Sequence, residues 1–126
     1  MNLSKVIEQV KALKSGYEIS HETLVMYINT VEQMILHDIV SGREGDAEIL
    51  ATFSGVNDES DGSTELFAQP PYDGVYSQYC ATQIDLLAED GERYINDSIV
   101  FKDTYNQFKR YWWQTHRQKN NYKYHQ

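Results

Sequence analysis

The sequence predicts a mainly α-helical single domain: a four-helix, bundle-like fold with a short β-hairpin or acidic loop between helices two and three. Apolar residues recur at three-and-four spacing near residues 4–15, 20–41, 73–88 and 92–115. Only residues 42–69 break this pattern, with glycines and an excess of acids. A length of 126 residues suits one hydrophobic core rather than two, so residues 1–126 are expected to form one domain.

The first two helices are expected to begin at serine caps. Ser4 and Ser20 each precede an apolar stripe, and their hydroxyls can accept hydrogen bonds from the first free amides of a helix. Gly16 and Gly42 follow the last periodic residues, as glycine often does at helix ends. The second helix is long and carries a wide apolar face, so it is expected to be the central core element. That face contains Leu24, Tyr27, Ile28, Val31, Met34, Ile35, Ile39 and Val40.

The last two helices are expected to form an antiparallel hairpin. The residues between them, Glu89–Gly91, are typical of a short turn, and a short turn makes consecutive helices neighbours. Glu89, Asp90 and Glu92 are interpreted as capping and dipole-complementing acids rather than as a catalytic pair. The fourth helix presents one seam to its partner: Tyr94, Ser98, Phe101, Tyr105, Phe108, Trp112 and Thr115.

Residues 42–69 are expected to form a β-hairpin or loop. Two short apolar runs, Ile49–Phe53 and Thr64–Phe67, flank a polar stretch rich in turn-forming residues. Gly55–Ser63 has almost nothing apolar to bury and is expected to be the most mobile interior part. The last residues, 117–126, lack apolar periodicity and are expected to fray.

Charge is distributed unevenly along the chain. The net charge is −8, yet all 19 acidic residues lie in residues 1–103, and residues 104–126 carry only bases. Proteins that grip duplex DNA usually present a basic surface over the folded body, which this sequence does not predict. The basic tail interleaves aromatic residues, as in single-strand binders, so three interpretations stay open for it: nucleic-acid binding, a protein contact, or ordinary helix-end chemistry.

No catalytic, cofactor or metal site is expected. The run Asn57–Gly62 matches part of a calcium loop, but Ala68 stands where a bidentate glutamate should be, so a solvated turn is the preferred interpretation. Zinc needs three or four converging ligands, and no histidine has a second ligand at metal spacing. Cys80 shares a face with Tyr76 and is interpreted as a small core residue. An enzyme site assembled only in an oligomer remains an alternative.

The setting of the protein can also be inferred from composition. No apolar run reaches the roughly 20 residues needed to span a bilayer, so no membrane association is expected. The N-terminus is predicted to be an amphipathic helix and not a signal peptide. A single cysteine cannot form an internal disulfide, which suits a reducing cytoplasm.

Several soft motifs give the chain a family resemblance. Near the C-terminus these are Pro71-Tyr72-Asp73 before a Tyr-rich helix, Gly91-Glu92-x-Tyr94-x-Asn96-Asp97, and an aromatic helix ending in Tyr111-Trp112-Trp113. Near the N-terminus they are Val6-Ile7-x-x-Val10-Lys11, Tyr17, Glu22 and Tyr27-Ile28-Asn29. With these motifs the chain resembles the head–tail connector proteins, the head-completion adaptors of tailed bacteriophages and prophages.

The resemblance implies a structural virion protein rather than an enzyme. Such connectors form a ring under the portal after DNA packaging, extend the DNA channel and offer a docking surface to tail components. It implies as partners other copies of the chain, the phage portal and tail-completion proteins, with DNA only as cargo in the channel. Localisation would be the virion, and the host bacterial cytoplasm during assembly. A ring-forming subunit of charge −8 is expected to be mostly monomeric in isolation.

Opposite charges suggest which surfaces meet in such a ring. The basic end of the last helix would contact the acidic body of the next subunit, in a head-to-tail arrangement. A small regulatory or nucleic-acid-binding module that uses the basic aromatic tail is the alternative function. The candidate interface residues are Glu44, Asp46, Glu48, Asp58, Glu59, Asp61, Lys109, Arg110 and Arg117.

Overall fold

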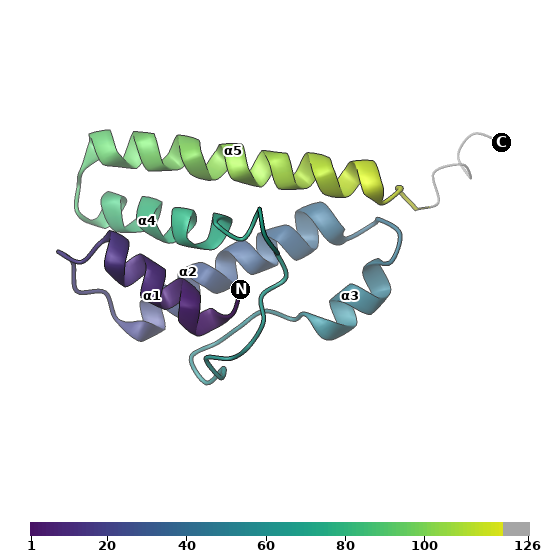
Figure 1. The fold of residues 1–126 in the computed structure, drawn as a ribbon, viewed down its shortest axis with the longest axis horizontal. Coiled ribbons are helices and arrows are strands. Elements are labelled where there is room, and N and C mark those ends of the chain that lie inside the picture. The colour runs from purple at the N-terminus through teal and green to yellow at the C-terminus, as the bar shows by residue number, and fades with distance from the viewer. Residues whose placement is uncertain (120–126) are drawn as a thin grey trace.

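A computed structural model describes residues 1–119 of the chain, and the part of the predicted tail at 120–126 lies outside the described residues. The described part is mainly helical, as predicted, and its helices pack side by side in a bundle-like arrangement (Figure 1). The elements are α1 (Leu3–Leu13), α2 (His21–Met34), η1 (Ile35–Val40), α3 (Asp46–Thr52), α4 (Val75–Leu87) and α5 (Gly91–Thr115).

The central element is α4 rather than the long second helix. α4 contacts α5, α2 and α1, and it lies between α5 and the two N-terminal helices (Figure 1). Its buried side chains cover more than one face, including Tyr76, Cys80 and Ile84 at 1% exposure or less. Cys80 is therefore a core residue, as predicted, and burial raises the pKa of its thiol to about 12. At that pKa the thiol stays protonated at neutral pH, which makes it a poor nucleophile.

The second helix continues without a break into a π-helical segment. Ser20 caps α2 as predicted, because its side chain accepts a hydrogen bond from the Thr23 amide. η1 follows directly after Met34 and ends at Ser41, whose amide donates to Leu36 O at 3.0 Å. That five-residue spacing replaces the four-residue spacing of an α-helix. The predicted helix over 20–41 is thus present, with its last turn wound more widely.

The first helix begins earlier than predicted. Asn2, and not Ser4, is the N-cap of α1, and its side chain accepts from the Lys5 amide at 3.0 Å. Asparagine and serine are nearly equivalent N-cap residues, so residue type does not decide which of the two caps the helix. Val6, Ile7 and Val10 form the buried stripe as predicted, while Leu13 is largely exposed.

The predicted β-hairpin in residues 42–69 is wrong. The first expected strand, Ile49–Phe53, lies largely within α3, whose sequence DAEILAT is rich in helix-forming residues. Asp46 and Glu48 lie in its first turn, where negative charge complements the helix dipole. These local preferences outweigh the short apolar run that had suggested a strand.

The second expected strand pairs with the N-terminus instead of with residues 49–53. Leu3 N donates to Thr64 O at 2.9 Å, and Leu66 N donates to Met1 O at 3.1 Å. Asn2 and Glu65 form an isolated antiparallel bridge at this point. The partner of residues 64–67 is more than sixty residues away in the chain, so no local sequence pattern could predict this pairing.

The intervening loop, expected to have almost nothing apolar to bury, buries one apolar residue, and hydrogen bonds hold both of its ends, at Val56 and at Gly62. Val56 is buried at 7% exposure, and its amide donates to Asn29 Oδ1 at 3.0 Å. Gly55 precedes it at φ +98°, and a Cβ there would lie 2.3 Å from the side chains of Asn29 and Gln33. Only glycine meets both demands, a left-handed backbone and close contact with α2.

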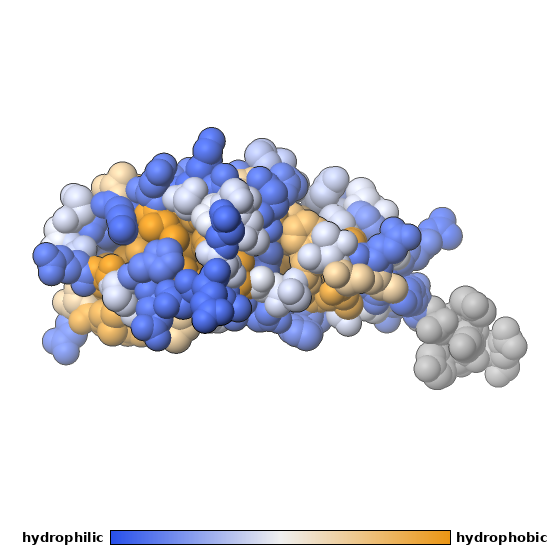
Figure 2. All heavy atoms as spheres, turned by 90° about the horizontal axis from the view of Figure 1, so that it is seen from below, coloured by the Kyte–Doolittle hydropathy of each residue, from blue (hydrophilic) through white to orange (hydrophobic). Residues whose placement is uncertain are grey.

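The surface of the described residues is mostly hydrophilic. Figure 2 shows apolar residues on one face in separate areas, surrounded by hydrophilic ones. None of the helices between residues 1 and 119 is both long and apolar enough to cross a membrane.

Candidate interaction site at the C-terminal end of α5

The candidate site lies at the C-terminal end of α5, a helix of 25 residues. Asp90 caps the helix through a hydrogen bond from the Arg93 amide, which confirms the capping role predicted for the acidic turn. The predicted seam is confirmed at its centre, where Phe101, Tyr105 and Phe108 are buried. At the end of the seam Trp112 is half-buried and Thr115 is exposed. The seam therefore leaves the bundle core near its C-terminal end and enters a more open region.

The chain after α5 folds back onto the acidic segment of the same molecule. We call residues 116–119 the C-terminal strap. Its main chain pairs with residues 42–44: Glu44 N donates to Arg117 O at 2.8 Å, and Lys119 N donates to Gly42 O at 2.9 Å. Arg43 and Gln118 form an antiparallel bridge between these hydrogen bonds.

Two side-chain contacts reinforce the strap. Lys119 Nζ lies 2.6 Å from Asp46 Oδ1, and Arg117 N donates to Glu44 Oε1 at 3.1 Å. The Lys119 ammonium and, next, the Gly42 amide lower the pKa of Asp46 by donating hydrogen bonds to its carboxylate. The basic end of the chain thus contacts the acidic segment of its own chain, and the contact predicted between subunits stays a prediction. Glu44 and Asp46 take part in the contact within the chain, whereas Glu48 is exposed on α3.

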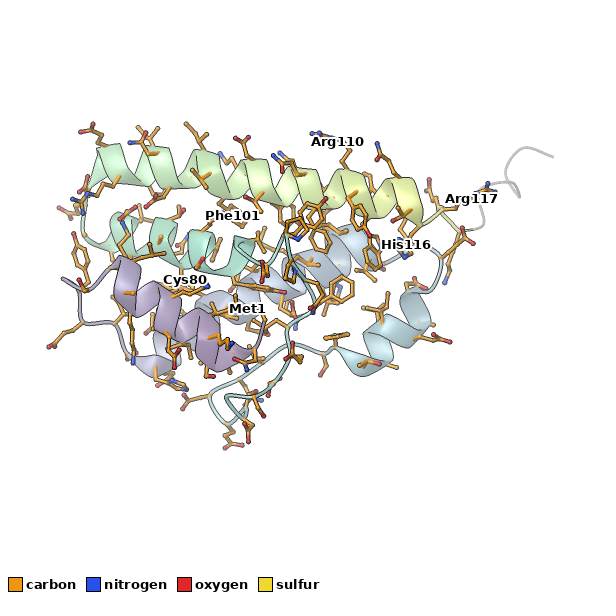
Figure 3. All side chains as sticks on the ribbon, in the orientation of Figure 1. Met1, Cys80, Phe101, Arg110, His116 and Arg117 are labelled. Atoms are coloured by element: carbon orange, nitrogen blue, oxygen red, sulfur yellow. The ribbon has the colours of Figure 1, made fainter. Side chains whose placement is uncertain are left out.

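Lys109 also contacts the acidic body of its own chain. Its Nζ lies 2.9 Å from Asp38 Oδ2, and the Tyr105 hydroxyl donates to the same oxygen at 2.8 Å. Burial opposes ionisation of Asp38, but hydrogen bonds from Lys109 and Tyr105 outweigh it, so the pKa of Asp38 lies below its usual value. Arg110 points outward from α5 and Arg117 lies just beyond its end (Figure 3). Neither guanidinium forms an ion pair with any residue of 1–119.

An aromatic pocket lies beside the strap. Its volume is about 440 Å³, and most of its walls are apolar. Tyr72 stacks on Phe108 and on Tyr111, with ring centroids 5.1 and 5.4 Å apart, and His116 of the strap stacks on Trp112 at 3.7 Å. We define the aromatic pocket by its lining residues: Phe53, Phe67, Gln69, Pro70, Pro71, Tyr72, Phe108, Tyr111 and Trp112.

One polar atom in the aromatic pocket has no partner. Trp112 Nε1 is shielded from solvent and donates to no acceptor in the described part of the chain. The neighbouring indole behaves differently, because Trp113 Nε1 donates to Ile39 O at 2.9 Å. A shielded donor without an acceptor is unfavourable, and the atoms that cover Trp112 Nε1 also separate it from a molecule in the aromatic pocket.

The remaining predicted interface residues lie elsewhere. Asp58, Glu59 and Asp61 occupy the turn after Val56, next to the N-terminal ends of α1 and α2: Asp58 lies 3.8 Å from His21, and Gly62 O accepts from Ser4 N. Asp61 accepts hydrogen bonds from both the amide and the hydroxyl of Ser63, which lower its pKa. The structure therefore does not bring the nine predicted residues into one surface.

Two buried carboxylate clusters were missed by reasoning from the sequence. Glu32 of α2, 1% exposed, accepts from Tyr76 Oη at 2.5 Å and from Phe67 N at 2.8 Å. Burial raises the pKa of Glu32, and hydrogen bonds from Tyr76 and Phe67 oppose that rise. The Tyr76 oxygen also accepts from Ala68 N, so this network holds the irregular chain at 67–68 against α2 and α4. A charged residue inside the apolar stripe of α2 was the available signal.

The second cluster joins three helices. Lys14 Nζ lies 2.6 Å from Asp85 Oδ1 and 3.2 Å from Asp97 Oδ2, at the ends of α1, α4 and α5 respectively. Asp85 is fully buried, and its other oxygen, Oδ2, has no hydrogen-bond partner in residues 1–119. Burial is the main cause that raises the pKa of Asp85, and the neighbouring Asp97 adds to it.

The end of α5 combines groups that can contact a bound molecule. Within residues 1–119 no three ligating side chains converge in a way that could hold a metal ion. The end of α5 carries the aromatic pocket, the exposed residues Arg110 and Arg117, and a strap of main-chain hydrogen bonds. Comparison with family models, with curated proteins and with solved structures found no match to this chain.

Proposed function

We propose that the chain is a structural head–tail connector of a tailed bacteriophage or prophage, forming a ring under the portal and extending the DNA channel. The proposal rests on the resemblance of its motifs to that family. The observation that supports it best is that several of the C-terminal motif residues make contacts near the two ends of the α4–α5 hairpin. Asp97 contacts Lys14 at one end, while Tyr72, Tyr111 and Trp112 line the aromatic pocket at the other.

The charge distribution is compatible with a DNA conduit. A wall of carboxylates repels phosphates at close range, which lets DNA pass without being held. The acidic residues of this chain outnumber its bases by eight, and Lys109 and Lys119 are already paired with Asp38 and Asp46. These pairings reduce the positive charge that the end of α5 could offer to nucleic acid.

Deleting the gene from an inducible prophage that encodes it would test this function. A connector acts after packaging, so the deletion should leave DNA-filled heads that carry no tails, visible by negative-stain electron microscopy. Supplying the chain from a plasmid should restore tailed particles. A normal yield of tailed virions from the deletion strain would contradict the proposal. The position of the gene after those for portal, protease and major capsid protein would support it independently.

The alternative of a nucleic-acid-binding module has its own test. The full chain and a variant lacking residues 117–126 would be titrated onto single- and double-stranded DNA at two salt concentrations. A salt-dependent shift that is lost on deletion would favour this alternative. The connector proposal predicts no shift at physiological salt for either protein.

A further inference from the structure

A second hollow lies on the exposed side of α5, apart from the aromatic pocket. Its volume is about 310 Å³, and Arg110 points away from the rest of the molecule there (Figure 3). Lys109 is paired with Asp38, and the Arg43 guanidinium lies 4.3 Å from the centre of the Trp113 ring. Arg110, by contrast, forms no ion pair within residues 1–119. We call this surface the basic hollow and define it by its lining residues: Asn106, Lys109, Arg110 and Trp113.

Acidic side chains with few partners lie on the other side of the molecule. Residues 57–61, which we call the acidic turn, project beyond α1 and α2 on the side opposite α5 (Figure 1). Asp58, Glu59 and Asp61 are all exposed. Among the described residues their one ion-pair contact is that of Asp58 with His21, at 3.8 Å. The acidic turn therefore presents carboxylates that the chain itself does not neutralise.

Hydrogen bonds hold the acidic turn in one shape. Ser60 N donates to Asn57 O at 3.0 Å, and Asn57 N donates to Ser60 Oγ at 2.9 Å. Glu59 N donates to Asn57 Oδ1 at 2.8 Å, and none of these bonds uses the Glu59 carboxylate. A preformed turn loses little conformational freedom when it binds, so its association with a partner costs less ordering free energy.

The acidic turn and the basic hollow are complementary in shape and in charge. The turn is convex and carries free carboxylates, whereas the hollow is concave and carries the unpaired guanidinium of Arg110. The two surfaces lie on opposite sides of the bundle, so they cannot meet within one chain (Figures 1 and 3). Two copies arranged one behind the other would bring them together.

We propose that the acidic turn of one copy binds in the basic hollow of the next copy, with Glu59 of the turn paired with Arg110 of the hollow. The contact joins two different surfaces, so it is head-to-tail and can close into a ring. It narrows the interface predicted from the sequence, because Asp46 and Lys109 contact residues of their own chain instead. Ring closure under a portal rests on the proposed function; the contact itself does not.

Exchanging the two charges would test the pairing. Copies with a net charge of −8 repel one another, so association of the full chain would be measured by sedimentation equilibrium in concentrated solution. Glu59→Lys and Arg110→Glu each place like charges opposite one another and should weaken association about tenfold. Glu59→Lys/Arg110→Glu restores the attraction with the signs exchanged and should associate like the wild type.

The net charge of these variants separates a specific contact from general repulsion. Glu59→Lys makes the chain less negative, so general repulsion alone predicts stronger association, whereas the proposal predicts weaker association. Association of Glu59→Lys at or above the wild-type level would overturn the proposal, and so would a double variant no better than Arg110→Glu. A wild type that stays monomeric at millimolar concentration would overturn it too. Both side chains are exposed, so circular dichroism of the four proteins should agree.

Disulfide formation between single-cysteine variants would show which surfaces meet. A mixture of Glu59→Cys and Arg110→Cys should give covalent dimers on oxidation. Each variant alone should give only the background of the wild type, whose Cys80 is fully buried. In the control mixture Met26→Cys replaces Glu59→Cys, because Met26 is 56% exposed on α2 and lies outside the acidic turn.

Two results of the cross-linking would overturn the proposal. One is a yield of covalent dimer in the Glu59→Cys and Arg110→Cys mixture no higher than in the control mixture. The other is equally efficient cross-linking of either variant with itself, because that would indicate a symmetric contact between identical surfaces.

Nucleic acid is the other occupant that a basic hollow could take. In that case Arg110→Glu should weaken a salt-dependent shift of single-stranded DNA, while Glu59→Lys should leave self-association at the wild-type level. That pair of results would overturn the proposed contact.

The outcomes also separate this contact from the proposed function. If the charge exchange restores association and the prophage deletion still yields tailed virions, the contact stands and the connector function fails. If the deletion leaves tailless DNA-filled heads and the charge exchange restores nothing, the connector function stands and subunits meet through other surfaces.

Discussion

Two lysine–aspartate contacts in this protein have the same length and different surroundings. Lys14 Nζ and Asp85 Oδ1 are 2.6 Å apart, and their side chains are 11% and 0% exposed. Lys119 Nζ and Asp46 Oδ1 are also 2.6 Å apart, but the lysine side chain is 42% exposed, while that of Asp46 is 11% exposed. The distance alone would suggest that the two contacts contribute equally to stability. Their burial does not, because removing one partner of a buried pair leaves an uncompensated charge, whereas water replaces a lost partner at the surface.

The comparison also shows what each contact is for. The Lys14 contact joins α1, α4 and α5, so it holds the core helices together. The Lys119 contact fastens a strap that is already held by main-chain hydrogen bonds to residues 42–44. Changes at the first site should appear as global unfolding, and changes at the second as local release of the strap.

The largest effect is expected for Lys14→Met. This substitution keeps the aliphatic stem and removes the ammonium from a fully buried carboxylate, so it should lower the free energy of unfolding by about 3 kcal/mol at pH 7. Urea denaturation would measure it, with Lys11→Met on the exposed side of the same helix as control. A loss no larger than that of the control would mean that water reaches Asp85.

A double substitution should recover much of that loss. Lys14→Met/Asp85→Asn removes the buried charge along with its partner, so it should be more stable than Lys14→Met alone by at least about 1 kcal/mol. The asparagine amide could also donate to Asp97, which the carboxylate of Asp85 cannot do without a proton. If the double variant is no more stable than the single one, the penalty of Lys14→Met does not come from the charge of Asp85.

Lowering the pH should have opposite effects on the contributions of Asp85 and Asp46 to folding stability. The pKa of Asp85 is raised in the folded protein, so its contribution favours folding below the unfolded value, near 3.9, and is lost as pH rises through the folded value. The destabilisation caused by Lys14→Met should therefore shrink as pH falls from 7 toward 4, when Asp85 takes up a proton. Repeating the urea denaturation across this range would measure the change, and a constant penalty would contradict the prediction.

The pKa of Asp46 is lowered, so its contribution is present above about 3.9 and is lost as pH falls through the folded value. The strap should therefore release only at a pH below the usual carboxyl range. The Gly42 amide, which donates to Asp46 Oδ2, would report this titration by NMR. In Lys119→Met the same signal should titrate at higher pH, and an unchanged midpoint would show that Lys119 does not stabilise the carboxylate.

The smallest effect on global stability is expected for that same substitution. The Lys119 ammonium is open to solvent, and Asp46, although largely covered, keeps the hydrogen bond from the Gly42 amide, so the urea midpoint of Lys119→Met should stay close to that of the wild type. Amide hydrogen exchange at Glu44 and Lys119, whose amides bond across the strap, should nevertheless accelerate. If the urea midpoint of Lys119→Met shifts while its amide exchange is unchanged, the Lys119 contact contributes to global stability and does not hold the strap.

The helices could be predicted from the sequence because their signals are local. Ser20, the acidic turn at Asp90 and the seam through Phe101 and Phe108 each depend on residues within a few positions. The hairpin prediction failed at α3 because the five-residue apolar run Ile49–Phe53 is too short to distinguish a helix from a strand. It failed at residues 64–67 because their partner is the N-terminus, which no local pattern identifies.

The candidate site was only partly predictable for a similar reason. The sequence predicted a contact between the basic end of one subunit and the acidic body of the next, whereas the contact of Lys119 with Asp46 lies within one chain. The aromatic pocket could not be foreseen, because it combines Phe53, Tyr72 and Trp112 from three separate stretches. The buried positions of Glu32 and Asp85 likewise depend on which helix faces point inward, and that is a property of the assembled bundle.

The number of residues in the π-helical segment η1 determines the direction in which the chain continues toward α3. Successive residues of an α-helix are about 100° apart around its axis, so one extra residue in a turn changes the direction in which everything after it leaves. Two groups of η1 accept hydrogen bonds from side chains of α5: the Asp38 carboxylate from the Tyr105 hydroxyl, and Ile39 O from the Trp113 indole. Deleting a single residue between 35 and 40 would restore α-helical winding. It would also change the direction of the chain that follows, so residues 42–44, which pair with the strap, and α3 would turn away from α5. Relatives of this chain can therefore be expected to keep the number of residues here even where they change their identity.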